Sequence, residues 1–180
     1  HLVFLLDASG SMQGAWPAVA AAINAISATR PATHVLKWAA GGAVRAAPLK
    51  ADLSACGAAD AEHIGFSTNL TVAATLLGDT LKGLVRGGAR RFLVVFVSDG
   101  CGDMDGLDDA CVAARAVVTG DGAPPGGVLE LTVLGVGAGF PTAVAMNMRA
   151  TLHAGRPSVP ALTLVDGRAT GLAAALDGLT

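Results

Sequence analysis

Two uninterrupted apolar runs in the chain each end close to an aspartate. Residues 2–6 (L-V-F-L-L) are followed by Asp7, and residues 92–97 (F-L-V-V-F-V) are followed by Ser98 and Asp99. Continuous apolar runs of this length are typical of parallel strands that are buried on both faces of a sheet. In such sheets, ligands bind just beyond the carboxyl ends of the strands. We therefore expect the polar residues after these two runs to lie at a binding edge.

Further short apolar runs alternate along the chain with apolar residues at helical spacing. Because parallel strands require right-handed crossover connections, this alternation predicts a doubly wound α/β fold with a mostly parallel sheet flanked by helices. The paired glycines Gly41 and Gly42 predict a turn that makes the third strand antiparallel to the second. The remaining expected strands are 34–39, 44–49, 128–136 and 161–165, and the expected helices are 16–29, 69–85, 107–119, 141–153 and 169–177.

Composition predicts one globular domain over residues 1–180. Apolar residues make up 52% of the 180 residues and charged residues only 14%, which suits a packed core and excludes a disordered tail. The chain opens with His1 directly in a strand, without Met, so we expect a segment cut from a longer protein. The 12 basic residues are dispersed at a net charge of −2, which argues against nucleic-acid binding. The longest uncharged stretch, residues 9–29, is interrupted by Pro17 and Asn24, so no membrane insertion is expected.

The three cysteines, Cys56, Cys101 and Cys111, match no zinc or redox spacing. Cys101 and Cys111 could form a disulfide if the intervening loop folds back. Free thiols are the favoured interpretation, and they suit a reducing, intracellular compartment. The sequence does not otherwise fix the localisation.

The first aspartate begins a loop with oxygen-bearing side chains at alternate positions. Asp7-Ala8-Ser9-Gly10-Ser11 is a D-x-S-x-S motif, and this spacing lets the three side chains converge on one point. Two further polar loops follow in order, at residues 65–70 (G-F-S-T-N-L) and 98–100 (S-D-G). Carboxylate and hydroxyl oxygens form a hard donor set that suits a divalent cation such as Mg²⁺.

This ordered set of motifs resembles the von Willebrand factor A (vWA) domain and its metal-ion-dependent adhesion site. The resemblance covers essentially the whole chain and includes the strand at residues 131–137 (L-T-V-L-G-V-G). It implies a sheet in the order 3-2-1-4-5-6 with one antiparallel edge strand, a vWA or Rossmann-like arrangement. It also implies a bound Mg²⁺ or Mn²⁺. The implied metal ligands are Asp7, Ser9, Ser11, Thr68 and Asp99. Ser98 stands where the family usually has Thr.

The donor set predicts binding to a protein partner, without catalysis. The site offers at most two carboxylates, so the remaining donors are neutral and the shell around a Mg²⁺ ion stays incomplete. We expect an Asp or Glu side chain of the partner to complete it. No catalytic residue and no organic cofactor site is predicted.

Three other interpretations stay open. Asp and Ser after a strand are also common turn and helix-cap residues, without any metal. A haloacid-dehalogenase-like phosphatase would use Asp7 as nucleophile, but it would need an acid/base aspartate at the position of Ser9. A structural adaptor would use the metal only to stabilise the loops.

Overall fold

A six-stranded sheet forms the centre of the fold, in the order β3-β2-β1-β4-β5-β6. The computed structural model describes residues 1–39, 42–44, 53, 71–100, 106–137, 143, 163–165 and 174. The strands are β1 (Leu2–Asp7), β2 (Thr33–Ala39), β3 (Gly42–Val44), β4 (Arg91–Ser98), β5 (Val128–Val136) and β6 (Thr163–Val165). All neighbouring pairs are parallel except β2 with β3. The predicted α/β class, strand order and antiparallel edge strand are therefore confirmed.

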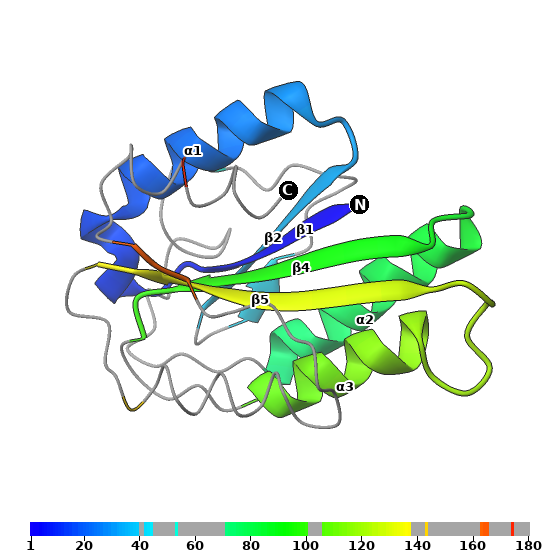
Figure 1. Cartoon of the computed structure of the whole chain (residues 1–180). Helices are drawn as coiled ribbons and strands as arrows, with labels where there is room; N and C mark the ends of the chain where they lie inside the picture. Colours follow the sequence, from blue (N-terminus) through cyan, green and yellow to red (C-terminus); the bar gives the residue numbers. More distant parts are fainter. Residues whose placement is uncertain are drawn as a thin grey trace.

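Helices cover both faces of the sheet (Figure 1). The helix α1 (Trp16–Thr29) lies on one face, and α2 (Thr71–Arg86) and α3 (Leu107–Val118) lie together on the other. A short 3-10 helix, η1 (Gly10–Gly14), precedes α1. In α1 the predicted bounds agree with the observed ones, and Pro17 occupies the first turn, where its missing N–H has no helical partner to lose.

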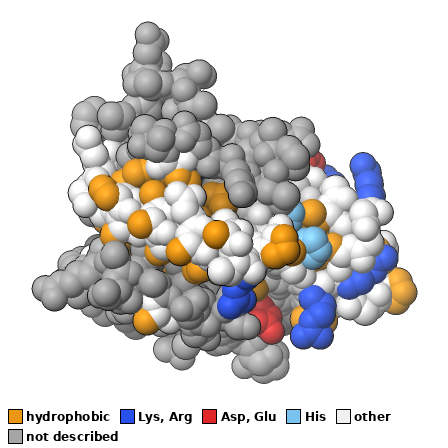
Figure 2. All heavy atoms as spheres, turned by 90° about the horizontal axis from the view of Figure 1, so that it is seen from above, with side chains coloured by type: hydrophobic (Ala, Val, Ile, Leu, Met, Phe, Trp, Pro, Cys, Tyr) orange, Lys and Arg blue, Asp and Glu red, His pale blue; other side chains and the backbone are white. Residues whose placement is uncertain are grey.

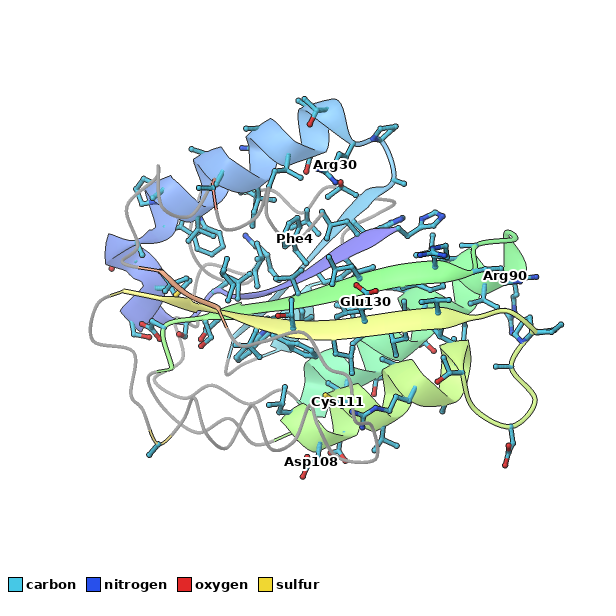
Figure 3. The ribbon with its side chains drawn as sticks, in the orientation of Figure 1. Phe4, Arg30, Arg90, Asp108, Cys111 and Glu130 are labelled. Atoms are coloured by element: carbon cyan, nitrogen blue, oxygen red, sulfur yellow. The ribbon has the colours of Figure 1, made fainter. Side chains whose placement is uncertain are left out.

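Strand β1 is buried on both faces because helices pack above and below it. Its alternate side chains enter two hydrophobic clusters, with Phe4 and Leu6 on the α1 side and Val3 and Leu5 on the side of α2 and α3. Figure 3 shows Phe4 between the sheet and α1, and Cys111 on α3 beyond the opposite face. Full burial of such side chains stabilises the fold by roughly 1.5–3 kcal/mol each. This two-sided burial explains why the sequence of the strand is uniformly apolar up to Asp7.

The third strand begins earlier than the sequence predicted. Trp38 pairs with Ala43, and Ala39 pairs with Gly42, so Gly42 belongs to the ladder instead of the turn. Two residues are enough to connect antiparallel strands, so Gly42 is not needed in the turn and can pair as the first residue of β3. Residues 45–49 of the expected strand lie outside the described residues, as do most residues of the expected helices 141–153 and 169–177.

No helix within the described part of the chain has both the length and the apolar character needed to cross a membrane.

Candidate functional site

The candidate metal site begins where β1 and β4 end side by side. Leu6 pairs with Val97, so the next residues, Asp7 and Ser98, occupy adjacent positions at the carboxyl edge of the sheet. Asp7 is fully buried and Ser98 is 1% exposed. Since ligands bind beyond this edge in open α/β sheets, the strand order places Asp7 at a favourable position for a binding residue.

Both oxygens of the Asp7 carboxylate accept hydrogen bonds. The backbone N–H of Ser9 donates to Oδ1 at 2.9 Å, and the Ser98 hydroxyl donates to Oδ2 at 2.7 Å. The first contact, from residue i to i+2, is an Asx-type turn, which is the local role that the simplest interpretation of the sequence predicted. The second contact joins residues that are 91 positions apart in the chain, so the carboxylate is oriented by the tertiary structure as well.

The two serines of the D-x-S-x-S motif face one another. The hydroxyl oxygens of Ser9 and Ser11 are 3.0 Å apart, and Ser9 is 3% exposed whereas Ser11 is exposed. Ser9 lies at the N-cap position of η1 in an extended conformation, but its side chain makes no capping hydrogen bond. A purely helix-capping role therefore does not account for Ser9.

The environment of Asp7 disfavours its ionised form. Burial raises the pKa of its carboxyl group above the ordinary value, and the nearby Asp99 carboxylate raises the pKa further. The hydrogen bonds from Ser98 and Ser9 oppose this change, because they stabilise the ionised form, but they do not cancel it. The ionised Asp7 is thus less stable here than in water, and a nearby cation would offset that cost.

Four of the five predicted metal ligands lie within the described residues. Asp7, Ser9 and Ser11 are brought together, and Asp99 is close enough to affect the pKa of Asp7. Thr68 lies outside the described residues. The assignment of these five residues as ligands stays a prediction.

The donor chemistry of this cluster fits a hard divalent cation. Its side-chain atoms are carboxylate and hydroxyl oxygens, the ligand types that Mg²⁺ and Mn²⁺ prefer. Among the described residues, no group of three or more His, Cys, Asp or Glu side chains could hold a metal ion. A cation at the end of β1 would therefore depend on serine hydroxyls as much as on carboxylates.

Two buried polar residues near this edge were not among the predicted metal ligands. Ser98 was expected at the binding edge, as part of the S-D-G loop and as a replacement for the usual Thr, but its hydrogen bond to Asp7 was not predicted. Lys37 is 4% exposed on β2, beside the last residues of β1, and its Nζ lies 5.5 Å from the centre of the Trp16 ring. Nothing in the sequence indicated that Lys37, a single charged residue within an apolar strand, would contact Trp16.

A pocket of about 510 Å³ lies at the opposite, amino edge of the sheet. Its lining includes Arg30 and Arg91 together with Glu130 on β5. Figure 3 shows Arg30 and Glu130 on the α1 side of the sheet, and Figure 2 shows Lys and Arg side chains around the His residues at this end of that face. None of the four predicted metal ligands within the described residues lines this pocket, which lies at the other edge of the sheet from Asp7 and Ser98.

The prediction of free thiols is confirmed for Cys111, which is a buried free thiol on α3. Burial raises its pKa to about 12. Cys56 and Cys101 lie outside the described residues.

Comparisons with known proteins give fold relatives but no sequence relatives. No family model matches the sequence, and no curated protein sequence matches it. Among solved structures, an aerotolerance-related membrane protein from Bacteroides fragilis, carrying multiple mutations to serine, is 14% identical. The match covers 99% of this chain and 97% of that chain, with a TM-score of 0.53. The manganese-loaded TRAP protein of Plasmodium vivax is 17% identical. That match covers 99% of this chain and 72% of the TRAP chain, with a TM-score of 0.56. The likeness to these proteins, together with the strand order, shows that the chain has a von Willebrand factor A-like fold.

Proposed function

We propose that this domain binds Mg²⁺ or Mn²⁺ and uses the ion to capture an acidic side chain of a partner protein. The residues that would hold the ion are Asp7, Ser9, Ser11, Thr68 and Asp99. The proposal rests above all on the arrangement at the end of β1, where a buried carboxylate and two serine hydroxyls converge beside the end of β4. The proposed role is binding, not catalysis.

The number and charge of the donors favour capture of a carboxylate. Mg²⁺ prefers octahedral oxygen coordination at about 2.1 Å, and the five candidate residues leave one position of an octahedron open. Both oxygens of Asp7 already accept hydrogen bonds from the protein, which spreads its negative charge. An Asp or Glu side chain of a partner would supply the oxygen for the open coordination position. It would also add negative charge that helps to neutralise the cation.

The comparison with TRAP supports the choice of manganese as a probe. That protein was solved in a manganese-loaded form and has the same type of fold. At 17% identity the likeness concerns the fold alone, so the metal must be tested directly on this chain.

Metal uptake is tested by titration calorimetry of the purified chain with Mn²⁺ and Mg²⁺. We expect saturable binding that Ser9→Ala and Asp99→Ala abolish or weaken at least tenfold, since each removes a proposed ligand. Ser27→Ala on α1 and Asp121→Ala, an exposed loop residue, are the matched controls and should bind as the original chain does. Absence of uptake by the original chain, or equal uptake by all variants, would refute the metal site.

Capture is tested with a pair of peptides that differ only by Asp or Asn at one central position. In Mn²⁺ the Asp peptide should bind and the Asn peptide should not, and EDTA should remove the difference. If Mn²⁺ binds and raises the melting temperature but neither peptide is retained, the structural-adaptor interpretation replaces capture. Hydrolysis of a phosphomonoester that is lost in Asp7→Asn would instead support a phosphatase.

A further inference from the structure

We infer that Ser98 is a positioning residue, whose hydroxyl couples the Asp7 carboxylate to the turn that carries Asp99. This inference rests on the proposed function, because Asp7 and Asp99 belong to the proposed metal site. It assigns a role to a residue that is not among the proposed ligands. Ser98 would set the affinity for the cation through the orientation of its two neighbours.

The contacts of Ser98 reach both parts of the site. Its hydroxyl donates to Oδ2 of Asp7 at 2.7 Å, and its Oγ accepts a hydrogen bond from the backbone N–H of Gly100 at 3.0 Å. Ser98 is 1% exposed and Asp7 is fully buried, so water does not substitute easily for either contact. The side chain thus connects the end of β1 to the turn after β4.

The direction of these hydrogen bonds is fixed by their chemistry. The Gly100 N–H is a donor only and the ionised carboxylate of Asp7 is an acceptor only, so the hydroxyl of Ser98 must accept from one and donate to the other. Hydrogen bonds linked in this way polarise and strengthen one another. Gly100 has a φ of 72°, in the left-handed region that glycine adopts readily. Asp99 lies between the two residues that this turn holds together.

Loss of the Ser98 hydroxyl would therefore disturb both carboxylates at once. Oδ2 of Asp7 would lose the hydrogen bond that Ser98 donates, and the buried amide of Gly100 would lose its hydrogen bond to Ser98 Oγ. Partners that orient metal ligands typically change metal affinity by about 10- to 100-fold when they are removed. The same reasoning predicts that threonine, which keeps the hydroxyl, preserves the coupling.

The test compares Ser98→Ala and Ser98→Thr with Val94→Ala. Val94 is fully buried on the same face of β4, in the same hydrophobic cluster as Phe96, and carries no hydroxyl, so it controls for a general loss of packing. Two quantities are measured on folded protein: the Mn²⁺ dissociation constant by calorimetry, and the hydrogen-exchange rate of the Gly100 amide by NMR in EDTA. The second measurement needs no metal.

We expect Ser98→Ala to bind Mn²⁺ at least tenfold more weakly and to exchange the Gly100 amide at least tenfold faster. Ser98→Thr and Val94→Ala should stay close to the original chain in both respects. Original affinity in Ser98→Ala, or an equal loss in Val94→Ala, would overturn the inference while leaving the metal site intact. If the original chain takes up no Mn²⁺, the proposed function fails, and unchanged Gly100 exchange in Ser98→Ala would separately refute the coupling.

Discussion

Replacement of Asp7 by asparagine should change the stability of the domain in opposite directions with and without a cation. Asp7 is fully buried, and its pKa remains raised although Ser98 and Ser9 both donate hydrogen bonds to the ionised carboxylate. A raised pKa means that the ionised form is penalised in the folded state relative to the unfolded chain. At pH 7 in EDTA, the neutral Asp7→Asn variant should therefore be the more stable protein.

The size of the effect follows from the linkage between pKa and stability. Each unit by which folding raises the pKa corresponds to about 1.4 kcal/mol at a pH above the folded pKa. An asparagine retains an oxygen for the Ser9 N–H, and its amide can donate to the Ser98 hydroxyl after that hydroxyl rotates. We therefore expect the variant to have the higher free energy of unfolding in EDTA. Mn²⁺ at about 100 times its dissociation constant adds about 2.7 kcal/mol to the stability of a chain that binds it. We expect the original chain to gain this and the variant, which lacks the Asp7 charge, to gain less, so that the order of stability reverses.

The assay is urea denaturation followed by circular dichroism, in EDTA and in Mn²⁺, with Asp121→Asn as an exposed control. The control should stay within about 0.5 kcal/mol of the original chain in both conditions. In EDTA the advantage of Asp7→Asn should shrink as the pH falls through the raised pKa of Asp7. It should vanish below the ordinary value of 3.8, where folded and unfolded chains are both protonated.

Two results would contradict this reasoning. A lower stability of Asp7→Asn in EDTA at pH 7 would show that the hydrogen bonds from Ser9 and Ser98 outweigh the cost of burial. Equal stabilisation of both proteins by Mn²⁺ would show that any bound cation lies elsewhere.

Three further predictions concern buried groups away from the site. The hydroxyl of Thr33 is buried and has no hydrogen-bond partner among the described residues, so Thr33→Val should leave the free energy of unfolding unchanged or raise it by up to about 1 kcal/mol in urea denaturation. Burial, and to a lesser extent the charge of the chain's amino group, lowers the pKa of His34 to about 4, which NMR titration of the ring should show. Since the unfolded chain takes up this proton at a higher pH, His34 should reduce stability as the pH falls from 6.5 towards 4. Burial raises the pKa of Cys111 to about 12, so a thiol reagent should modify this residue only after unfolding, and rapid reaction of the native protein would contradict that expectation.

The elements with strong hydrophobic patterns were predictable almost to the residue. The bounds of α1 and β5 agree with the expected ranges, because α1 has apolar positions at helical spacing and β5 is a mostly apolar run, rich in Val and Leu, that follows turn-forming residues. The start of β3 was not predictable, since Gly42 serves equally well in a turn or a short edge strand. Only pairing with Ala39 decides between the two.

The local part of the candidate site was also predictable, but its long-range part was not. The alternate spacing of Asp7, Ser9 and Ser11 indicated convergence, and the structure brings these residues together. The contact between Ser98 and Asp7 depends on the register of β1 against β4, which pairs Leu6 with Val97. That register is set by packing on both faces of the sheet and cannot be deduced from either strand alone.

The position of Asp7 explains why stability and the proposed function oppose each other in this fold. Strand β1 has β2 and β4 as neighbours and helices on both faces, and the side chain of its last residue, Asp7, is removed from water. A neutral residue would be the more stable choice at such a position in the absence of a ligand. The chain instead carries a buried carboxylate, oriented by Ser9 and Ser98, whose charge these donors do not fully offset. Perturbed, oriented groups of this kind are typical of functional sites, because the cost of the charge is recovered when a ligand of opposite sign binds. The same residue that weakens the empty domain would thus supply the affinity for the cation.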